Sequence, residues 1–203
     1  MRSLLFCLAL LLPASALADP IESQKIITAA TGDWNGDGAI DLAMIVETEP
    51  GVAMDMRFFL RDKDHNFLKP AGIVQEQMYG EWNGYDRPGY EASYIEPELT
   101  ALPNGSIKLY IPAIPIDGAK TDQTLTIAWR NGAFVVAGFA YDYHDYMKDN
   151  VASDCDYNLL TGKGKSSKMQ PDGTSVHKVV SVKGKVVPFA EWDSGASFTD
   201  CGA

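Results

Sequence analysis

Residues 32–43 read Gly32-Asp33-Trp34-Asn35-Gly36-Asp37-Gly38-Ala39-Ile40-Asp41-Leu42-Ala43. Side chains that carry oxygen recur in this stretch at Asp33, Asn35, Asp37 and Asp41. Two glycines, Gly36 and Gly38, can adopt the positive φ that a tight curl of the backbone requires. The stretch therefore predicts a short loop whose oxygen atoms gather around a common centre.

An oxygen-only set of donors suits calcium, a hard cation that takes about six to eight oxygen ligands. The candidate metal ligands are the side chains of Asp33, Asn35, Asp37 and Asp41 and the backbone carbonyl of Ala39. Three carboxylates this close together would repel one another without a cation. The alternative interpretation is a turn rich in Asp, Asn and Gly that holds no ion.

The loop begins like an EF-hand loop but does not end like one. An EF-hand carries a Glu at the twelfth loop position and a helix on each side. The twelfth position here is Met44, and residues 42–46 form a short apolar run with β-branched side chains, bounded by Glu47 and Pro50. Such a run favours a buried strand over a helix. We therefore expect the loop to join two strands.

These residues resemble the calcium loop of the FG-GAP and VCBS-type repeats, which occur in integrin-like β-propellers and in many secreted bacterial proteins. The resemblance covers residues 32–43 and occurs once in the chain. It implies that Asp33, Asn35, Asp37 and Asp41 are the side-chain ligands of Ca²⁺ and that Ala39 is the backbone ligand.

The rest of the chain has the pattern of an all-β protein. Short runs rich in apolar residues and bounded by turn residues predict strands at residues 26–30, 42–47, 53–61, 73–78, 98–102, 107–111, 124–130, 134–143, 157–160, 177–182 and 186–189. Asn-Gly pairs at 104–105 and 131–132 predict hairpin turns, and we expect a third hairpin between 177–182 and 186–189. Residues 143–151 have room for one or two helical turns.

The expected fold is therefore built from antiparallel hairpins, as a β-sandwich, an irregular barrel or a small propeller-like domain. The length of 203 residues suits a single domain after removal of a leader. Residues 1–18 have the features of that leader, with Arg2, an apolar core and Ala16-Leu17-Ala18 as the cleavage site. We expect residues 19–203 to form one all-β domain in the periplasm or the extracellular medium.

The composition excludes some partners. The chain has 17 Lys and Arg against 27 Asp and Glu, for a net charge of −10, which argues against nucleic acid and anionic membrane surfaces as partners. Beyond the leader, no apolar run is long enough to span a bilayer, so no membrane insertion is expected.

Two cysteines, Cys155 and Cys201, remain beyond the leader. An even count in an exported protein predicts a disulfide, which here would fix the C-terminal end of the chain. The alternative is a redox-active pair, but the spacing is not the C-x-x-C of such pairs.

Two further segments are candidates for binding. Residues 79–94 carry Trp82, Tyr85, Tyr90 and Tyr94, whose rings suit a carbohydrate or protein ligand, or else pack the segment onto the sheet. Residues 163–185 hold six lysines against the single acid Asp172, which suits an acidic partner or a solvated loop.

The leading functional hypothesis is a non-catalytic, calcium-binding module. An alternative is a secreted hydrolase of polysaccharide or peptide that uses Asp142 and His144, or a carboxylate pair that sequence does not identify. Asp142 and His144 lie two residues apart and would share one strand face. A third hypothesis is an inhibitor or adhesin that presents an exposed loop.

Overall fold

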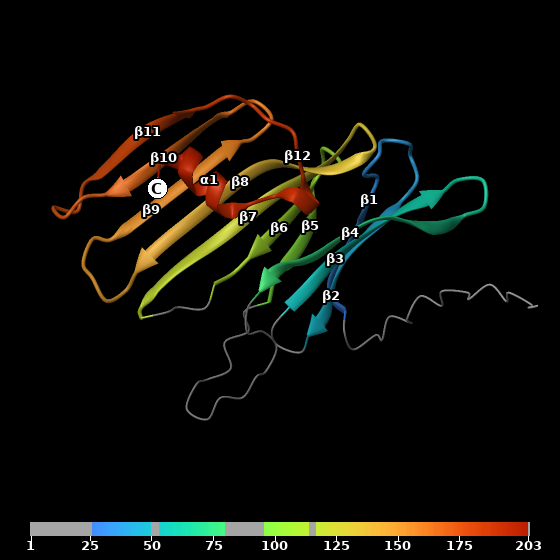
Figure 1. Cartoon of the computed structure of the whole chain (residues 1–203), viewed down its shortest axis with the longest axis horizontal. Coiled ribbons are helices and arrows are strands. Elements are labelled where there is room, and N and C mark those ends of the chain that lie inside the picture. Colours follow the sequence, from blue (N-terminus) through green and yellow to red (C-terminus); the bar gives the residue numbers. More distant parts are fainter. Residues whose placement is uncertain (1–25, 50–52, 80–95, 114–116, 203) are drawn as a thin grey trace, which may run out of the picture.

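A computed structural model describes residues 26–49, 53–79, 96–113 and 117–202, which form two antiparallel sheets and a short C-terminal helix (Figure 1). The expected leader at 1–18 and the aromatic residues Trp82, Tyr85, Tyr90 and Tyr94 lie outside the described residues. The all-β prediction is confirmed in its sandwich form, because the described strands make two sheets and no closed barrel.

The small sheet has four strands in the order β1-β2-β3-β4. Its strands are β1 (Ile26–Gly32), β2 (Asp41–Glu49), β3 (Ala53–Asp62) and β4 (Phe67–Tyr79). The edge strand β4 begins earlier than the predicted 73–78 and includes Pro70, which lies at a register shift opposite Phe59. Proline is tolerated at such a position, since an edge strand at an irregularity does not need every amide in its ladder.

The large sheet has the order β11-β10-β9-β8-β7-β6-β5, with β12 as an eighth strand beside β8. Its strands are β5 (Glu98–Ala101), β6 (Ile107–Ile111), β7 (Ala119–Arg130), β8 (Ala133–Asp145), β9 (Ala152–Asn158), β10 (Lys163–Met169), β11 (Ser175–Ser181) and β12 (Val187–Pro188). The Asn131-Gly132 turn between β7 and β8 has positive φ at both residues, as the sequence predicts.

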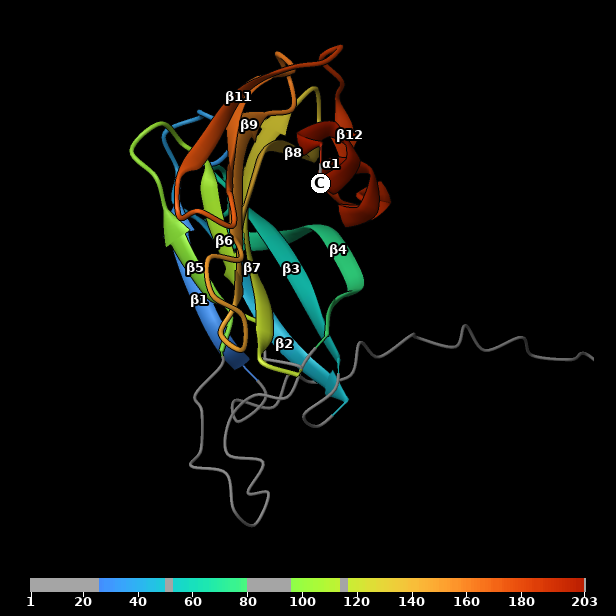
Figure 2. The ribbon, with the colours of Figure 1, turned by 90° about the vertical axis from the view of Figure 1, so that its left-hand side faces the viewer.

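Most of the buried apolar residues of both sheets belong to one cluster. Phe58 of β3 stacks on Phe134 of β8 with ring centroids 3.9 Å apart, and its edge meets Phe189. The small sheet thus packs against part of one face of the large sheet, and β1 lies beside β5 (Figure 2).

The C-terminal segment covers more of that face. It comprises β12, the 3₁₀ turn η2 (Phe189–Glu191) and α1 (Ser194–Cys201), and Figure 2 shows β12 and α1 on one side of β8 and β9. The ring of Phe198 in α1 packs against Phe139 and Tyr141 of β8, at centroid distances of 5.2 and 4.9 Å. The Asp193 side chain caps the helix by accepting from the Gly195 amide, and Gly202 ends it in the left-handed conformation.

Three local predictions were wrong. Residues 143–145 continue β8 and 146–150 form turns, so no helix lies there. The predicted hairpin between 177–182 and 186–189 does not form, because β11 pairs with β10 while β12 pairs with β8. The predicted short strand at 157–160 overlaps only the last two residues of a longer strand, β9, and residues 159–160 form a turn.

No helix in the described part of the chain is both long enough and apolar enough to cross a membrane.

Candidate metal centre

The candidate loop, residues 33–40, connects β1 to β2, as the sequence predicts. The pair Gly32 and Asp41 closes its base in the β1–β2 ladder. Gly36 and Gly38 have φ values of 74° and 86°, which are the positive values that the curl requires.

Three of the four predicted side-chain ligands turn inward to the same part of the loop. The Asp37 amide donates to Asp33 Oδ1 and to Asn35 Oδ1, both at 3.0 Å, so these two oxygens flank one nitrogen. The Gly38 amide donates to Asp33 Oδ2 at 2.8 Å. The Ala39 amide donates to Asp37 Oδ1 at 2.8 Å, and the Asn35 side-chain amide donates to Asp37 Oδ2 at 3.0 Å.

Asp41 plays a different part from the other three. It is 1% exposed, and its carboxylate accepts from the Trp34 amide at 2.9 Å and from the Arg61 amide at 2.8 Å. The first bond closes the loop and the second joins it to β3. A carboxylate has about four lone-pair sites, so these bonds do not exhaust its capacity to accept.

Within the described ranges, no three His, Cys, Asp or Glu side chains form a group arranged to hold a metal ion. The loop acids are instead bonded to backbone amides of the loop and of β3. The donor set still fits calcium chemically, because every candidate atom is an oxygen and the loop contributes three carboxylates.

Trp34 fixes the loop to the protein core. Its ring is 4% exposed and belongs to the main apolar cluster. The ring lies over Gly32, where a Cβ would come within 2.5 Å of the ring atom Cη2. A glycine two residues before the tryptophan is therefore a packing requirement, which motif reading did not explain.

The end of β3 and the turn that follows it supply positive charge beside the loop. Lys63 Nζ lies 3.7 Å from Asp37 Oδ1, and the Arg61 guanidinium donates to the Ile40 carbonyl at 2.7 Å. The bond from the Ala39 amide, followed by the Asn35 side chain and Lys63, lowers the pKa of Asp37, and partial burial opposes this shift. Sequence reasoning did not identify Arg61 or Lys63 as neighbours of the loop.

The predicted Asp142–His144 pair forms. His144 Nε2 lies 2.6 Å from Asp142 Oδ1 on β8, and the His144 ring stacks on Tyr146 at a centroid distance of 6.0 Å. The two side chains are about half exposed, and in the ladders Asp142 lies opposite Asp122 on β7 and Asp154 on β9. Asp122 is itself bound by Lys120 at 2.7 Å.

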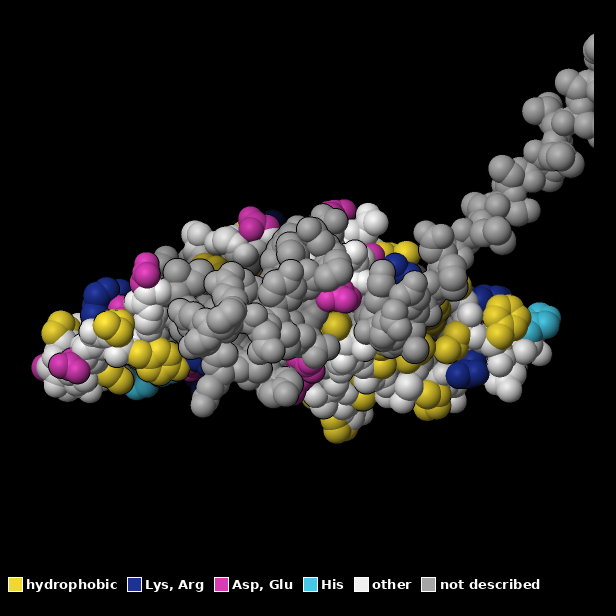
Figure 3. All heavy atoms as spheres, turned by 90° about the horizontal axis from the view of Figure 1, so that it is seen from below, with side chains coloured by type: hydrophobic (Ala, Val, Ile, Leu, Met, Phe, Trp, Pro, Cys, Tyr) yellow, Lys and Arg dark blue, Asp and Glu magenta, His cyan; other side chains and the backbone are white. Residues whose placement is uncertain are grey.

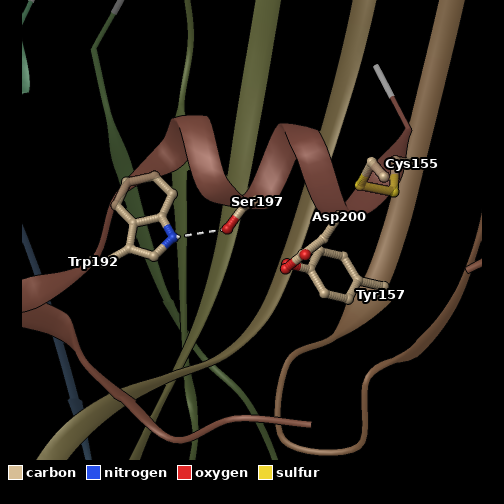
Figure 4. Close-up of a disulfide and its surroundings, with 6 residues drawn as sticks. Cys155, Tyr157, Trp192, Ser197 and Asp200 are labelled. Atoms are coloured by element: carbon tan, nitrogen blue, oxygen red, sulfur yellow. Dashed lines mark hydrogen bonds between the residues drawn. A yellow bond between two sulfur atoms is a disulfide. The ribbon is translucent and has the colours of Figure 1, made fainter. Parts of the chain in front are cut away.

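The predicted disulfide is present between Cys155 on β9 and Cys201 on α1, with a Cα–Cα distance of 6.0 Å. Figure 4 shows the helix lying across β9, with Asp200 beside Tyr157 and Trp192 beside Ser197. The Tyr157 hydroxyl donates to Asp200 at 3.0 Å, and Lys185 also donates to Asp200, at 2.8 Å. The disulfide therefore fixes one end of a helix that already has polar anchors.

Charged side chains of both signs occur together on the molecule. Figure 3 shows the face seen from below, where the described acidic and basic side chains are interspersed with apolar ones.

Comparisons of this chain with protein-family models, with curated proteins and with solved structures found no match to any of them.

Proposed function

We propose that this chain is an exported β-sandwich protein that binds calcium in the β1–β2 loop and acts as a non-catalytic binding module. The observation that carries the calcium part is the convergence of Asp33, Asn35 and Asp37 oxygens on the amides of residues 37–39. The leader pattern at residues 1–18 supports export to the periplasm or the extracellular medium.

Asp33, Asn35, Asp37 and Asp41 would hold the ion with their side-chain oxygens, and Ala39 with its carbonyl. A bound Ca²⁺ supplies positive charge that offsets the repulsion among three carboxylates. The chain itself provides the frame: Trp34 buried in the core, Asp41 bonded to β3, and two glycines that allow the curl. A loop anchored in this way loses less entropy when it binds an ion.

The role proposed for the ion is structural. The loop joins β1 to β2, and the Asp41 carboxylate extends the connection to Arg61 of β3. Three of the four strands of the small sheet therefore meet at this loop. Calcium in the loop would stabilise the end of that sheet.

The partner of the module would be a protein or a carbohydrate, with Trp82, Tyr85, Tyr90 and Tyr94 as candidate contacts.

The test is a thermal melt of the purified protein in excess calcium and in chelator. A hundredfold excess over Kd should add about 2.7 kcal/mol, which corresponds to a rise of about 5–10 °C for a domain of this size. Asp37→Ala should abolish the rise. Asp64→Ala, which removes a neighbouring acid of the β3–β4 turn, should keep it. Equal midpoints of the wild type in the two buffers would refute the proposal.

A second candidate function, hydrolysis of polysaccharide or peptide, is favoured by the 2.6 Å contact between Asp142 and His144. A carboxylate that orients a histidine is a common arrangement for general base catalysis. Turnover measured on a panel of polysaccharide and peptide substrates distinguishes the two functions. Turnover that is lost in His144→Ala and retained in Asp37→Ala would favour the hydrolase, and no turnover in the wild type would favour the module.

A further inference from the structure

The lysine-rich segment is not a loop but a hairpin, formed by β10 and β11 at the edge of the large sheet. Strand periodicity divides its lysines between the two faces. Ser166 pairs opposite Cys155, whose disulfide reaches α1, so Ser166 lies on the face that carries the helix. Lys178 pairs opposite Ser166, and Lys168 lies two residues further along β10, so both lysines share that face. Lys165, opposite Val179, lies on the other face.

A cavity of about 60 Å³ lies on the α1 side of this hairpin, next to the end of the helix. Its lining includes Tyr141, Ser153, Ser166, Lys168, Lys178 and Gly202. A volume of this size accommodates a few water molecules or one small polyatomic ion.

Two hydroxyls at the cavity, those of Ser166 and Tyr141, make no hydrogen bond to a described residue. Ser166 is 8% exposed and Tyr141 is 6% exposed, yet neither hydroxyl bonds to another residue in the described part of the chain. Both residues line the cavity, so their hydroxyls are available to a group that binds there.

The charge at the cavity is positive. Across the described ranges, neither Lys168 nor Lys178 forms an ion pair, although the whole chain carries a net charge of −10. Two acids in the described part of the chain near the cavity already have partners, since Asp200 is bound by Lys185 and Tyr157, and Asp154 by Ser167. The dipole of α1 places about half a negative charge at the C-terminal end of the helix. The two positive charges of Lys168 and Lys178 outweigh it.

We propose that this cavity binds a small oxyanion group, namely a carboxylate, phosphate or sulfate. Lys168 and Lys178 provide the charge, and the hydroxyls of Ser166 and Tyr141 provide neutral donors. Charge-assisted bonds of this kind are the stronger ones in proteins, and several donors around one cavity match the several acceptors of an oxyanion. The group is either a free anion or part of an acidic chain such as a Glu-rich peptide.

The experiment is calorimetric titration of the full chain, in calcium-free buffer, with inorganic phosphate and separately with a hexaglutamate peptide. We expect saturable one-site binding of phosphate. Lys168→Gln/Lys178→Gln should weaken it at least about tenfold, the effect of losing one charge-assisted hydrogen bond. The matched control Lys165→Gln/Lys183→Gln removes the same charge away from the cavity and should change Kd by about twofold or less.

Ser166→Ala is a second variant, which leaves the charge unchanged and should also weaken phosphate binding. Unliganded melting midpoints verify that each variant is folded. Peptide binding that depends on Lys168 and Lys178 would identify the source as an acidic chain, and binding of phosphate alone would identify a free anion. The proposal is overturned if phosphate gives no saturable signal, or if the control variant weakens binding as much as the cavity variant.

Discussion

The Trp34 indole lies directly over the Cα of Gly32, two residues earlier in the chain, so that a Cβ at position 32 would lie 2.5 Å from Cη2 of the ring. The indole is part of the main apolar cluster, which couples the candidate metal loop to the core of the protein. A perturbation at the base of the loop should therefore be felt as a loss of global stability.

Gly32→Ala should destabilise the protein by about 1–3 kcal/mol, because the added methyl forces the buried ring to move. Urea unfolding monitored by fluorescence measures this change. Gly72→Ala is the matched control, since a Cβ there meets Phe58 at an ordinary 3.7 Å. The packing argument fails if the two variants lose the same stability.

Asp41→Ala should cost about 2–4 kcal/mol even in chelator, because the amides of Trp34 and Arg61 would both lose their acceptor. Asp37→Ala should cost less in the same buffer, because it frees one main-chain amide, that of Ala39, at a more exposed site. Denaturant unfolding in chelator gives the comparison. Equal losses for the two variants would show that Asp41 has no special structural role.

Reduction of the Cys155–Cys201 disulfide should lower stability by at most about 4 kcal/mol, the chain-entropy value for a separation of 46 residues. Release of α1 should also expose Trp192, which is buried beside Ser197. Melts with and without reductant, followed by tryptophan fluorescence, measure both effects. Cys155→Ser/Cys201→Ser should not respond to reductant, and an unchanged wild-type midpoint would contradict the expectation.

Alkaline pH should weaken the anchor of α1. Burial and the Asp200 carboxylate raise the pKa of Tyr157 from its ordinary 10 to about 12. A hydrogen bond with Ser197 opposes this shift without cancelling it. A raised pKa means that the folded state holds the proton more tightly. The stabilisation is therefore complete below pH 10 and is lost as the pH rises from 10 to 12.

The measurement is unfolding stability against pH for the wild type and for Tyr157→Phe. The wild type should be the more stable of the two at neutral pH by about 1 kcal/mol, for the hydrogen bond to Asp200. That advantage should shrink between pH 10 and 12. An advantage that is constant over this range would contradict the assigned pKa shift.

The all-β fold could be predicted from the sequence because its central strands alternate clearly. Leu125 and Ile127 are buried, and Trp129 on the same face is partly buried and packs against the core. Asn131-Gly132 marks the turn that follows. The disulfide could also be predicted, since only two cysteines, Cys155 and Cys201, lie outside the expected leader at residues 1–18.

The elements that the sequence missed have weak local signals. Strand β10 reads Lys-Gly-Lys-Ser-Ser-Lys-Met, with no apolar alternation, and forms because β9 and β11 both pair with it. Gly164 is needed there, since a Cβ would clash with Tyr157. The helix α1 has Gly, Ser and Thr among its eight residues, which are poor helix formers, so its cap, its disulfide and Phe198 decide its formation.

The candidate site could be predicted only in part. The loop, its glycines and the convergence of Asp33, Asn35 and Asp37 follow from local spacing. The burial of Asp41 against Arg61 does not, because it depends on the pairing of β2 with the end of β3, which lies about twenty residues further along the chain. Long-range contacts of this kind depend on the register of strands, and motif spacing carries no information about register.

Calcium binding by the β1–β2 loop is tested most directly by calorimetric titration of metal-free protein with calcium chloride, for the wild type, Asp37→Ala and Asp64→Ala. We expect one saturable site in the wild type and in Asp64→Ala, and no binding in Asp37→Ala. Absence of saturable heat in the wild type, or an unchanged isotherm in Asp37→Ala, would contradict the assignment of the loop as a calcium site.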